Sequence, residues 1–134
     1  MLQNRSMPAS TVIPVLAYPS VPEAVAWLTA AFGFTLRLGI GDHRAQLNAG
    51  DGAIVITGGG AGAAPHRDSI MVRVDDARRH CDRAAAHGAT IAMPPTDFPY
   101  GERQYTAIDC CGRPWTFSET IADVDPREWG GDLR

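Results

Sequence analysis

Short runs of apolar and polar residues follow one another along the chain, and two stretches with a helical rhythm interrupt them. Runs rich in β-branched residues with alternating polarity are typical of strands, and apolar residues every three or four positions are typical of a helix. The pattern predicts the order strand, helix, strand, strand, strand, and predicts it twice. The first set covers residues 11–18, 20–33, 34–40, 43–49 and 53–57, and the second covers 69–74, 75–88, 89–92, 102–108 and 114–119.

Both predicted helices carry signals at their ends. Ser20 and Glu23 form an S-x-x-E capping box, in which the two side chains satisfy backbone N–H groups of the first turn. The second helix has Asp75 or Asp76 as its N-cap and ends at Gly88. These signals fix where each helix begins and ends.

The two sets also resemble each other in sequence. "AAFGFTL" (30–36) matches "AAHGATI" (85–91), and "GDGAIVIT" (50–57) lies over "CCGRPWTF" (110–117) at a shift of 60 residues. Such self-similarity indicates an internal duplication. We therefore expect a flexible lead (1–10), a single domain (11–119) of two βαβββ modules (11–57 and 68–119) joined by a glycine-rich linker (58–67), and a tail (120–134).

The segment "YGERQYTAIDCCGRPWTFSE" (100–119) is the most specific motif of the chain. With the paired modules it resembles the vicinal oxygen chelate superfamily of glyoxalases, extradiol dioxygenases and fosfomycin- and bleomycin-resistance proteins. It is similar to the W/Y-G-x-R…D-P-x-G-x-x-W pattern of the bleomycin-resistance-like branch, although Cys110 and Cys111 replace the usual proline and aspartate. The resemblance implies an α+β fold in which a curled mixed β-sheet lines a cleft and the helices cover its outer face.

The same resemblance tells where a metal would be bound. Enzymes of the superfamily carry His and Glu ligands near the start of each module's first strand and in the middle of its last strand. Those positions correspond here to Ile13 (or Pro14 with a slip of one residue), Ile56, Ser69 and Thr116. Two aliphatic side chains and two hydroxyls are not a ligand set for a divalent ion. We expect neither a metal nor another cofactor, and no catalytic residue of the metal-dependent kind.

The side chains expected to line the cleft suit an organic molecule that is held by packing and a few oriented hydrogen bonds. The loop before residue 102 adds aromatic side chains and an arginine that could stack on a planar ligand. For Tyr105 the alternative is a place in the core, and for Arg103 a structural tie to a carboxylate. The predicted ligand-binding residues are Arg44, Gln46, Ser69, Met71, Phe98, Tyr100, Arg103, Tyr105, Thr116 and Ser118.

Composition excludes some partners. The net charge of −3 gives no reason to expect nucleic acid or an anionic membrane surface. No apolar run approaches the ~20 residues that span a bilayer, and the first residues lack the apolar part of a secretion signal. Three cysteines, two of them adjacent, are not a disulfide framework. We expect a cytoplasmic protein.

Three functions remain open at this point. The first is a non-catalytic binding protein, a homodimer that sequesters an antibiotic or a related aromatic metabolite and so gives resistance. The second is a glyoxalase- or dioxygenase-like enzyme, a lyase or isomerase, with a non-standard or absent metal site. The third is an accessory domain that uses the fold only as a scaffold for dimerisation. The occupants of the ligand positions favour the first.

Overall fold

The computed structural model describes residues 2–60, 66 and 68–134 of the chain. It divides into two compact units, which we describe separately. Unit 1 contains the first module together with Cys110–Gly112, and unit 2 contains the second module and the C-terminal tail. Most of the predicted linker, residues 61–65 and 67, lies outside the described residues.

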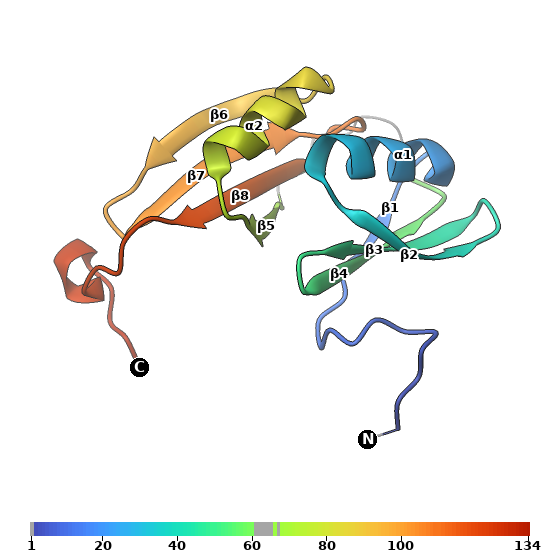
Figure 1. The fold of residues 1–134 in the computed structure, drawn as a ribbon, viewed down its shortest axis with the longest axis horizontal. Helices are drawn as coiled ribbons and strands as arrows, with labels where there is room; N and C mark the ends of the chain where they lie inside the picture. Colours follow the sequence, from blue (N-terminus) through green and yellow to red (C-terminus); the bar gives the residue numbers. More distant parts are fainter. Residues whose placement is uncertain (1, 61–65, 67) are drawn as a thin grey trace. The chain divides into compact units, whose positions relative to one another are not determined.

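Unit 1 is a four-stranded mixed sheet with one helix (Figure 1). The strand order is β1-β4-β3-β2; β1 and β4 are parallel and the other pairs are antiparallel. A parallel pair requires a crossover, and the helix with the β2–β3 hairpin supplies it. The elements are β1 (Val15–Ala17), α1 (Val21–Phe32), β2 (Thr35–Ile40), β3 (Arg44–Ala49) and β4 (Gly52–Thr57).

Unit 2 repeats this arrangement with the strand order β5-β8-β7-β6. Here β5 and β8 are parallel, and β6, β7 and β8 are antiparallel neighbours. The elements are β5 (Ile70–Arg73), α2 (Ala77–Ala86), β6 (Thr90–Asp97), β7 (Glu102–Ile108) and β8 (Pro114–Thr120), followed by a short 3-10 helix, η1 (Pro126–Trp129). The expected α+β class and the two βαβββ modules are confirmed.

Two strands differ from the prediction by more than two residues in length, and proline explains both. The first strand begins only at Val15, after Pro14, which cannot donate to a sheet. In unit 2 the strand predicted to end at residue 92 continues to Asp97, through Pro94 and Pro95. This is possible because β6 is an edge strand and its register shifts between Met93 and Thr96, which takes the prolines out of the pairing.

The helix ends follow the sequence signals. The Ser20 hydroxyl accepts a hydrogen bond from the Glu23 N–H at 3.3 Å, and Asp76, not Asp75, is the N-cap of α2. Each cap satisfies a backbone donor that the first helical turn leaves without a partner. Gly33 ends α1 with φ 77°, a left-handed conformation that glycine adopts without strain.

Each sheet buries one face against its own helix, because side chains alternate between the two faces of a strand. In unit 1 the apolar side chains of that face come from three strands and meet α1. They are Leu16, Ala45, Leu47, Ile54 and Ile56, all buried. In unit 2 the corresponding buried side chains are Tyr105, Ala107, Trp115 and Phe117.

Asp109 gives the core of unit 2 its polar anchor. Its carboxylate accepts hydrogen bonds from the Trp115 indole N–H and from the Arg113 backbone N–H, both at 3.0 Å. A buried indole N–H requires such an acceptor, since leaving it unpaired costs about 1–3 kcal/mol. The aspartate of the "DCCG" turn therefore orders the turn and fixes the indole of β8. Among the described residues no helix is long and apolar enough to cross a membrane.

Candidate functional site

The face of the unit 2 sheet that lies away from α2 holds three of the predicted ligand-binding residues, Met71, Thr116 and Ser118. The strand register puts Met71, Thr116 and Thr106 side by side on this face, and puts Ser118 beside Gln104. Its members come from β5, β7 and β8, and we call it the unit 2 face. It consists of Met71, Arg73, Glu102, Gln104, Thr106, Thr116, Ser118 and Thr120.

A chain of hydrogen bonds runs across the unit 2 face. The Tyr100 hydroxyl donates to the Gln104 side-chain oxygen at 3.2 Å, and the Gln104 amide donates to the Ser118 hydroxyl at 3.0 Å. Ser118 in turn donates to the Glu102 carboxylate at 2.6 Å. Gln104 and Ser118 are 8% and 4% exposed, so these bonds satisfy polar groups that have lost contact with water. The chain fixes the direction of each dipole on the face.

The hydrogen-bond chain ends at the carboxylate of Glu102. Burial alone would raise its pKa, but hydrogen bonds from Ser118 and Thr120 and the positive charge of Arg73 together hold the pKa below its ordinary value. Arg73 also donates to the Thr120 hydroxyl at 2.7 Å. Glu102 is therefore ionised at neutral pH and acts as an acceptor on the face.

The rest of the unit 2 face is less polar and more accessible. Met71 is 62% exposed, which is unusual for a large apolar side chain in the middle of a strand. Beside it the hydroxyls of Thr106 and Thr116 lie 3.1 Å apart and bond to each other. A thioether with two adjacent hydroxyls is a surface on which an organic molecule can pack and also find a hydrogen bond.

Aromatic rings stand at one end of the unit 2 face. Phe98 and Tyr100 stack with ring centroids 5.4 Å apart and an interplanar angle of 10°. Trp129 from η1 meets Tyr100 edge-on at 5.5 Å, so the C-terminal tail docks on this cluster. Since Tyr100 also begins the hydrogen-bond chain, the rings and the polar face are one connected surface.

Two predicted binding residues belong to the other side of the sheet. Tyr105 is fully buried beneath α2, its hydroxyl bonded to His80 Nδ1, and burial raises its pKa far above the ordinary value. His80 is therefore half-buried on the sheet side of α2. Tyr105 lies between Gln104 and Thr106 in β7. Because those two side chains belong to the unit 2 face, the Tyr105 side chain points to the α2 side. Of the two interpretations of Tyr105, a place in the core is therefore correct and a place in the binding site is wrong.

Arg103 also lies on the α2 side. Its guanidinium donates to Asp97 at 2.7 Å and 3.2 Å and lies 3.9 Å from Glu119, and this carboxylate accepts the Ala77 N–H at the start of α2. The hydrogen bond with Asp97 raises the pKa of Arg103 and lowers that of Asp97. Arg103 is thus a structural tie between β6, β7 and the helix.

Equivalent positions of β4 and β8, the last strands of the two modules, lie 61 residues apart in the structure. The sequence match assumed a spacing of 60 residues and therefore places Ile56 wrongly. In unit 1 Leu47 of β3 pairs with Ile54 of β4. In unit 2 the equivalent residue of β7, Ala107, pairs with Trp115 of β8. Ile56 therefore corresponds to Phe117, is fully buried under α1, and is not at the metal-ligand position. The counterpart of Thr116 is Val55.

The correction leaves the ligand positions of the superfamily without suitable donors. Val55 offers no donor atom, Ile13 and Ser69 precede the first strands, and the Thr116 hydroxyl bonds Thr106. No group of three or more His, Cys, Asp and Glu side chains that could hold a metal ion occurs in the described part of the chain. These residues do not fit the metal of the enzymatic members.

In unit 1 the predicted residues Arg44 and Gln46 lie on the face away from α1, with Val15 and Val55. Gln46 is 4% exposed, and its amide already has partners. Its oxygen accepts from Arg37, and its nitrogen donates to the Ser6 carbonyl at 2.9 Å. Residues 2–10 form no helix or strand, and residues 5–7 are held against this sheet.

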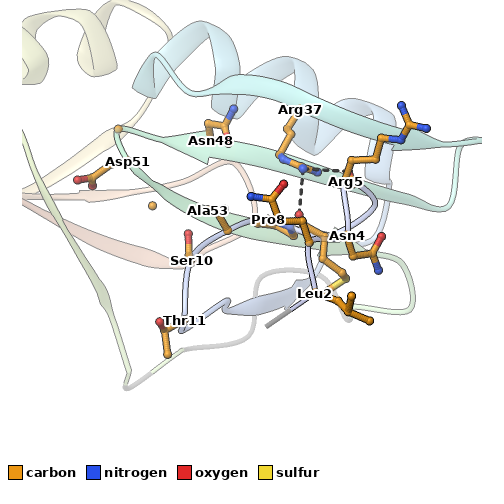
Figure 2. A pocket seen from close by; sticks show the side chains of 15 residues that line it. Leu2, Asn4, Arg5, Pro8, Ser10, Thr11, Arg37, Asn48, Asp51 and Ala53 are labelled. Carbon is orange, nitrogen blue, oxygen red and sulfur yellow. Dashed lines mark hydrogen bonds between the residues drawn. The ribbon is translucent and has the colours of Figure 1, made fainter.

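A cavity of about 1090 Å³ lies between this N-terminal segment and strands β2–β4 (Figure 2). Arg37 reaches into it from β2, and Asn48 and Ala53 line it from β3 and β4. Its size is that of a site for a drug-sized molecule. The cavity belongs entirely to unit 1.

Sequence reasoning missed several residues of these two surfaces. Gln104, Thr106 and Glu102 share the parity of β7 that faces Thr116 and Ser118, so strand alternation and the register could have identified them. Arg37 gave no signal, because it occupies a bulge in β2, and Trp129 lies in a tail without periodicity.

Comparison with known proteins agrees with this geometry. The family model of the Glyoxalase/Bleomycin resistance protein/Dioxygenase superfamily matches residues 12–117. The chain belongs to this superfamily. TioX from Micromonospora sp. ML1 is similar to this chain with 32% identity over 84% of the chain and 100% of TioX, at a TM-score of 0.71. No curated protein matches.

More distant structures share the fold. A glyoxalase/bleomycin resistance protein/dioxygenase from Nocardioides is 15% identical, with a TM-score of 0.70, over 93% of this chain and 89% of its own. The bleomycin-binding protein of bleomycin-producing Streptomyces verticillus, solved with copper(II)-bleomycin, is 20% identical, with a TM-score of 0.64, over 89% of this chain and 98% of its own. The vicinal oxygen chelate fold expected from the sequence is confirmed.

Proposed function

We propose that this protein binds a small organic molecule, an aromatic or peptide drug, and lowers its free concentration without making or breaking a bond. The observation that carries the proposal is the unit 2 face, where an exposed thioether and paired hydroxyls lie beside a fixed hydrogen-bond chain and an aromatic cluster. The similarity to TioX and to a protein that binds copper(II)-bleomycin supports a place in the bleomycin-resistance-like branch.

The groups on the unit 2 face are suited to binding and poorly suited to acid–base catalysis. An efficient general acid or base has a pKa near the working pH. The pKa of Glu102, the carboxyl group of the hydrogen-bond chain, is held below its ordinary value, which makes it a weak base. The other members of the chain are an amide, an aliphatic hydroxyl and a phenol. They orient a ligand and do not react with it.

Affinity would come mainly from contact with apolar and aromatic groups. Met71 packs against the ligand, Tyr100 and Phe98 stack on its planar part, and each such contact contributes about 0.5–1.5 kcal/mol. The hydroxyls of Thr106 and Thr116 would exchange their mutual hydrogen bond for one to the ligand. The protein would act as a homodimer in the cytoplasm of a bacterium, where it protects the cell against the drug.

Trp129 provides the test, since it is 42% exposed and touches Tyr100. Tryptophan fluorescence is titrated with copper(II)-bleomycin and with peptide antibiotics that carry planar aromatic groups. We expect saturable quenching by at least one compound, loss of the signal in Trp129→Phe, and at least tenfold weaker binding in Met71→Glu. The compound is then recovered, and its molecular mass is measured by mass spectrometry. A changed mass would show turnover and contradict the proposal.

A further inference from the structure

The N-terminal segment carries a turn whose carbonyl groups are directed at the unit 1 sheet. The Asn4 carbonyl accepts from the Met7 N–H at 3.1 Å, and the Asn4 side chain accepts from the Ser6 N–H at 3.0 Å. This local geometry turns the carbonyls of Arg5, Ser6 and Met7 toward the same donors. The segment is thus held through its backbone.

The donors are the side chains of Arg37 and Gln46. Arg37 Nη2 donates to the carbonyls of Arg5 and Met7 at 3.0 Å and 2.9 Å, and Gln46 Nε2 donates to that of Ser6 at 2.9 Å. Figure 2 shows the Arg37 side chain directed at the segment, with its hydrogen bonds as dashed lines.

A bulge positions this pair. The register of β2 against β3 shifts between Leu36 and Leu38, which leaves Arg37 as the extra residue. A bulge re-aims a side chain, and here Arg37 Nη1 bonds the Gln46 oxygen. That bond turns the oxygen of the Gln46 amide group toward Arg37 and directs its N–H donors outward. The two side chains form a rigid array of N–H donors.

The array is unusual in having only neutral acceptors. The hydrogen bonds of Arg37 go to an amide oxygen and two carbonyls, and no ion pair of Arg37 with a carboxylate is found among the described residues. The planar fork of the guanidinium divides its donors: Nη1 holds the Gln46 oxygen, and Nη2 holds two carbonyls of the same turn. The array therefore matches a peptide backbone.

We propose that Arg37 and Gln46 form a binding site for the backbone carbonyls of a peptide-like ligand, and that residues 4–7 occupy this site as an internal ligand. The ligand displaces the turn, lies on the face of β2–β4 that the segment and its cavity of about 1090 Å³ now cover, and takes over the hydrogen bonds of the turn. This inference rests on the proposed function, because it names the peptide-like part of the drug and a second surface that holds it. The segment competes with the ligand and lowers its apparent affinity.

Trypsin tests the internal contact in the full chain, because it cleaves after Arg5 only when the segment leaves the sheet. The hydrogen bonds to the charged guanidinium hold the segment on the sheet, and cleavage follows the population of the open form. We expect Arg37→Lys, which keeps the charge and loses the fork, to speed cleavage at Arg5 at least tenfold. The control is Arg78→Lys, the same substitution at an exposed position of α2 in unit 2, and equal rates in the two variants would overturn the proposal.

A second experiment tests the site itself with a defined probe, the acetylated peptide of residues 2–10. The protein is a chain that starts at residue 9; the deleted residues pair with no strand and precede the family match, which begins at residue 12. We expect NMR signals of the Gln46 side-chain amide to shift saturably at millimolar peptide toward their positions in the full chain. Arg37→Lys should weaken this binding at least tenfold, and Arg78→Lys on α2 should not.

Gln46 signals that do not move up to several millimolar peptide would overturn the assignment. The same spectra separate this inference from the proposed function, because the probe peptide requires no antibiotic. If the peptide binds at Arg37 and Gln46 and no drug binds anywhere, the carbonyl site stands and the drug-binding function falls.

Discussion

Gln104 links the two parts of the unit 2 face. Its oxygen accepts from Tyr100 in the aromatic cluster, and its nitrogen donates to Ser118 in the central part of the face. A buried amide with both ends bonded orders its neighbours, and a buried polar group left without a partner is costly. The orientation of the Tyr100 and Ser118 hydroxyls on the face therefore depends on this residue.

Gln104→Leu should lower the free energy of unfolding by about 1–3 kcal/mol, because it leaves the Tyr100 and Ser118 hydroxyls without their partner. Urea denaturation followed by circular dichroism measures the change. Gln3→Leu, the same substitution at an exposed position, should stay within about 0.5 kcal/mol of the wild type. Equal effects of the two substitutions would mean that the buried chain does not stabilise the sheet.

Glu102 makes the stability of unit 2 depend on pH. Its pKa is lower in the folded protein than the ordinary value of 4.5, so its contribution is complete well above pH 4.5 and is lost as the pH falls through the folded-state pKa. Glu102→Gln should therefore show a smaller loss of stability than the wild type between about pH 5 and pH 3. Urea denaturation at pH 7, 5 and 3 measures the difference, and parallel pH profiles would contradict the account.

At the scale of elements, caps and turns decide how each helix and strand is held. α2 is short, ten residues, and most of its exposed side is charged. A helix of that length is stable only through its packing and its ends. The Asp76 cap and the Glu119 carboxylate, which accepts the Ala77 N–H, serve the first turn.

Asp76→Ala should lower the free energy of unfolding by about 1 kcal/mol, because the Arg79 N–H loses its acceptor at 3.0 Å. Asp75→Ala is the matched control, since it removes the same charge one residue earlier and leaves the cap in place. Thermal unfolding of both variants measures the effect. An equal loss in the control would assign the stabilisation to the charge and not to the hydrogen bond.

The turn before β7 and the start of the tail meet at Gly101. Its φ is 83°, its carbonyl accepts the N–H groups of Ile121 and Ala122, and an added Cβ would lie 2.1 Å from the Ala122 oxygen. Gly101→Ala therefore adds a backbone clash to the ordinary strain of a left-handed residue, which is about 1–2 kcal/mol.

Gly88→Ala separates the two effects, since Gly88 has φ 89° and open space around its Cα. We expect Gly101→Ala to lower the melting temperature clearly more than Gly88→Ala, and to change the near-ultraviolet dichroism of Trp129, whose tail moves. Similar melting temperatures would show that the tail does not press on Gly101.

For the whole molecule, the order of elements and the duplication could be predicted from sequence because they depend on local patterns. Faces were harder to predict, since one additional residue in a turn reverses every side chain of the next strand. The longer turn before β8 shifted the correspondence from 60 to 61 and put Ile56 in the wrong place. The contact of residues 5–7 with Arg37 and Gln46 joins segments about 30 to 40 positions apart, and no local pattern predicts it.

The superfamily uses one fold both for metal enzymes and for proteins that bind, so fold alone does not decide the function. The central claim is that the positions that hold a metal in the enzymes are here occupied by Val55 and Thr116, and that the surface takes an organic ligand. The alternative function, a metal-dependent enzyme, would require His and carboxylate side chains at these positions.

Elemental analysis of protein purified without a histidine tag or a chelator tests this claim most directly. We expect far less than one equivalent of zinc, nickel, iron or manganese per chain, and the same after incubation with these ions and dialysis. About one equivalent of any of them, retained through dialysis, would contradict the account and return the chain to the metal-dependent members of its superfamily.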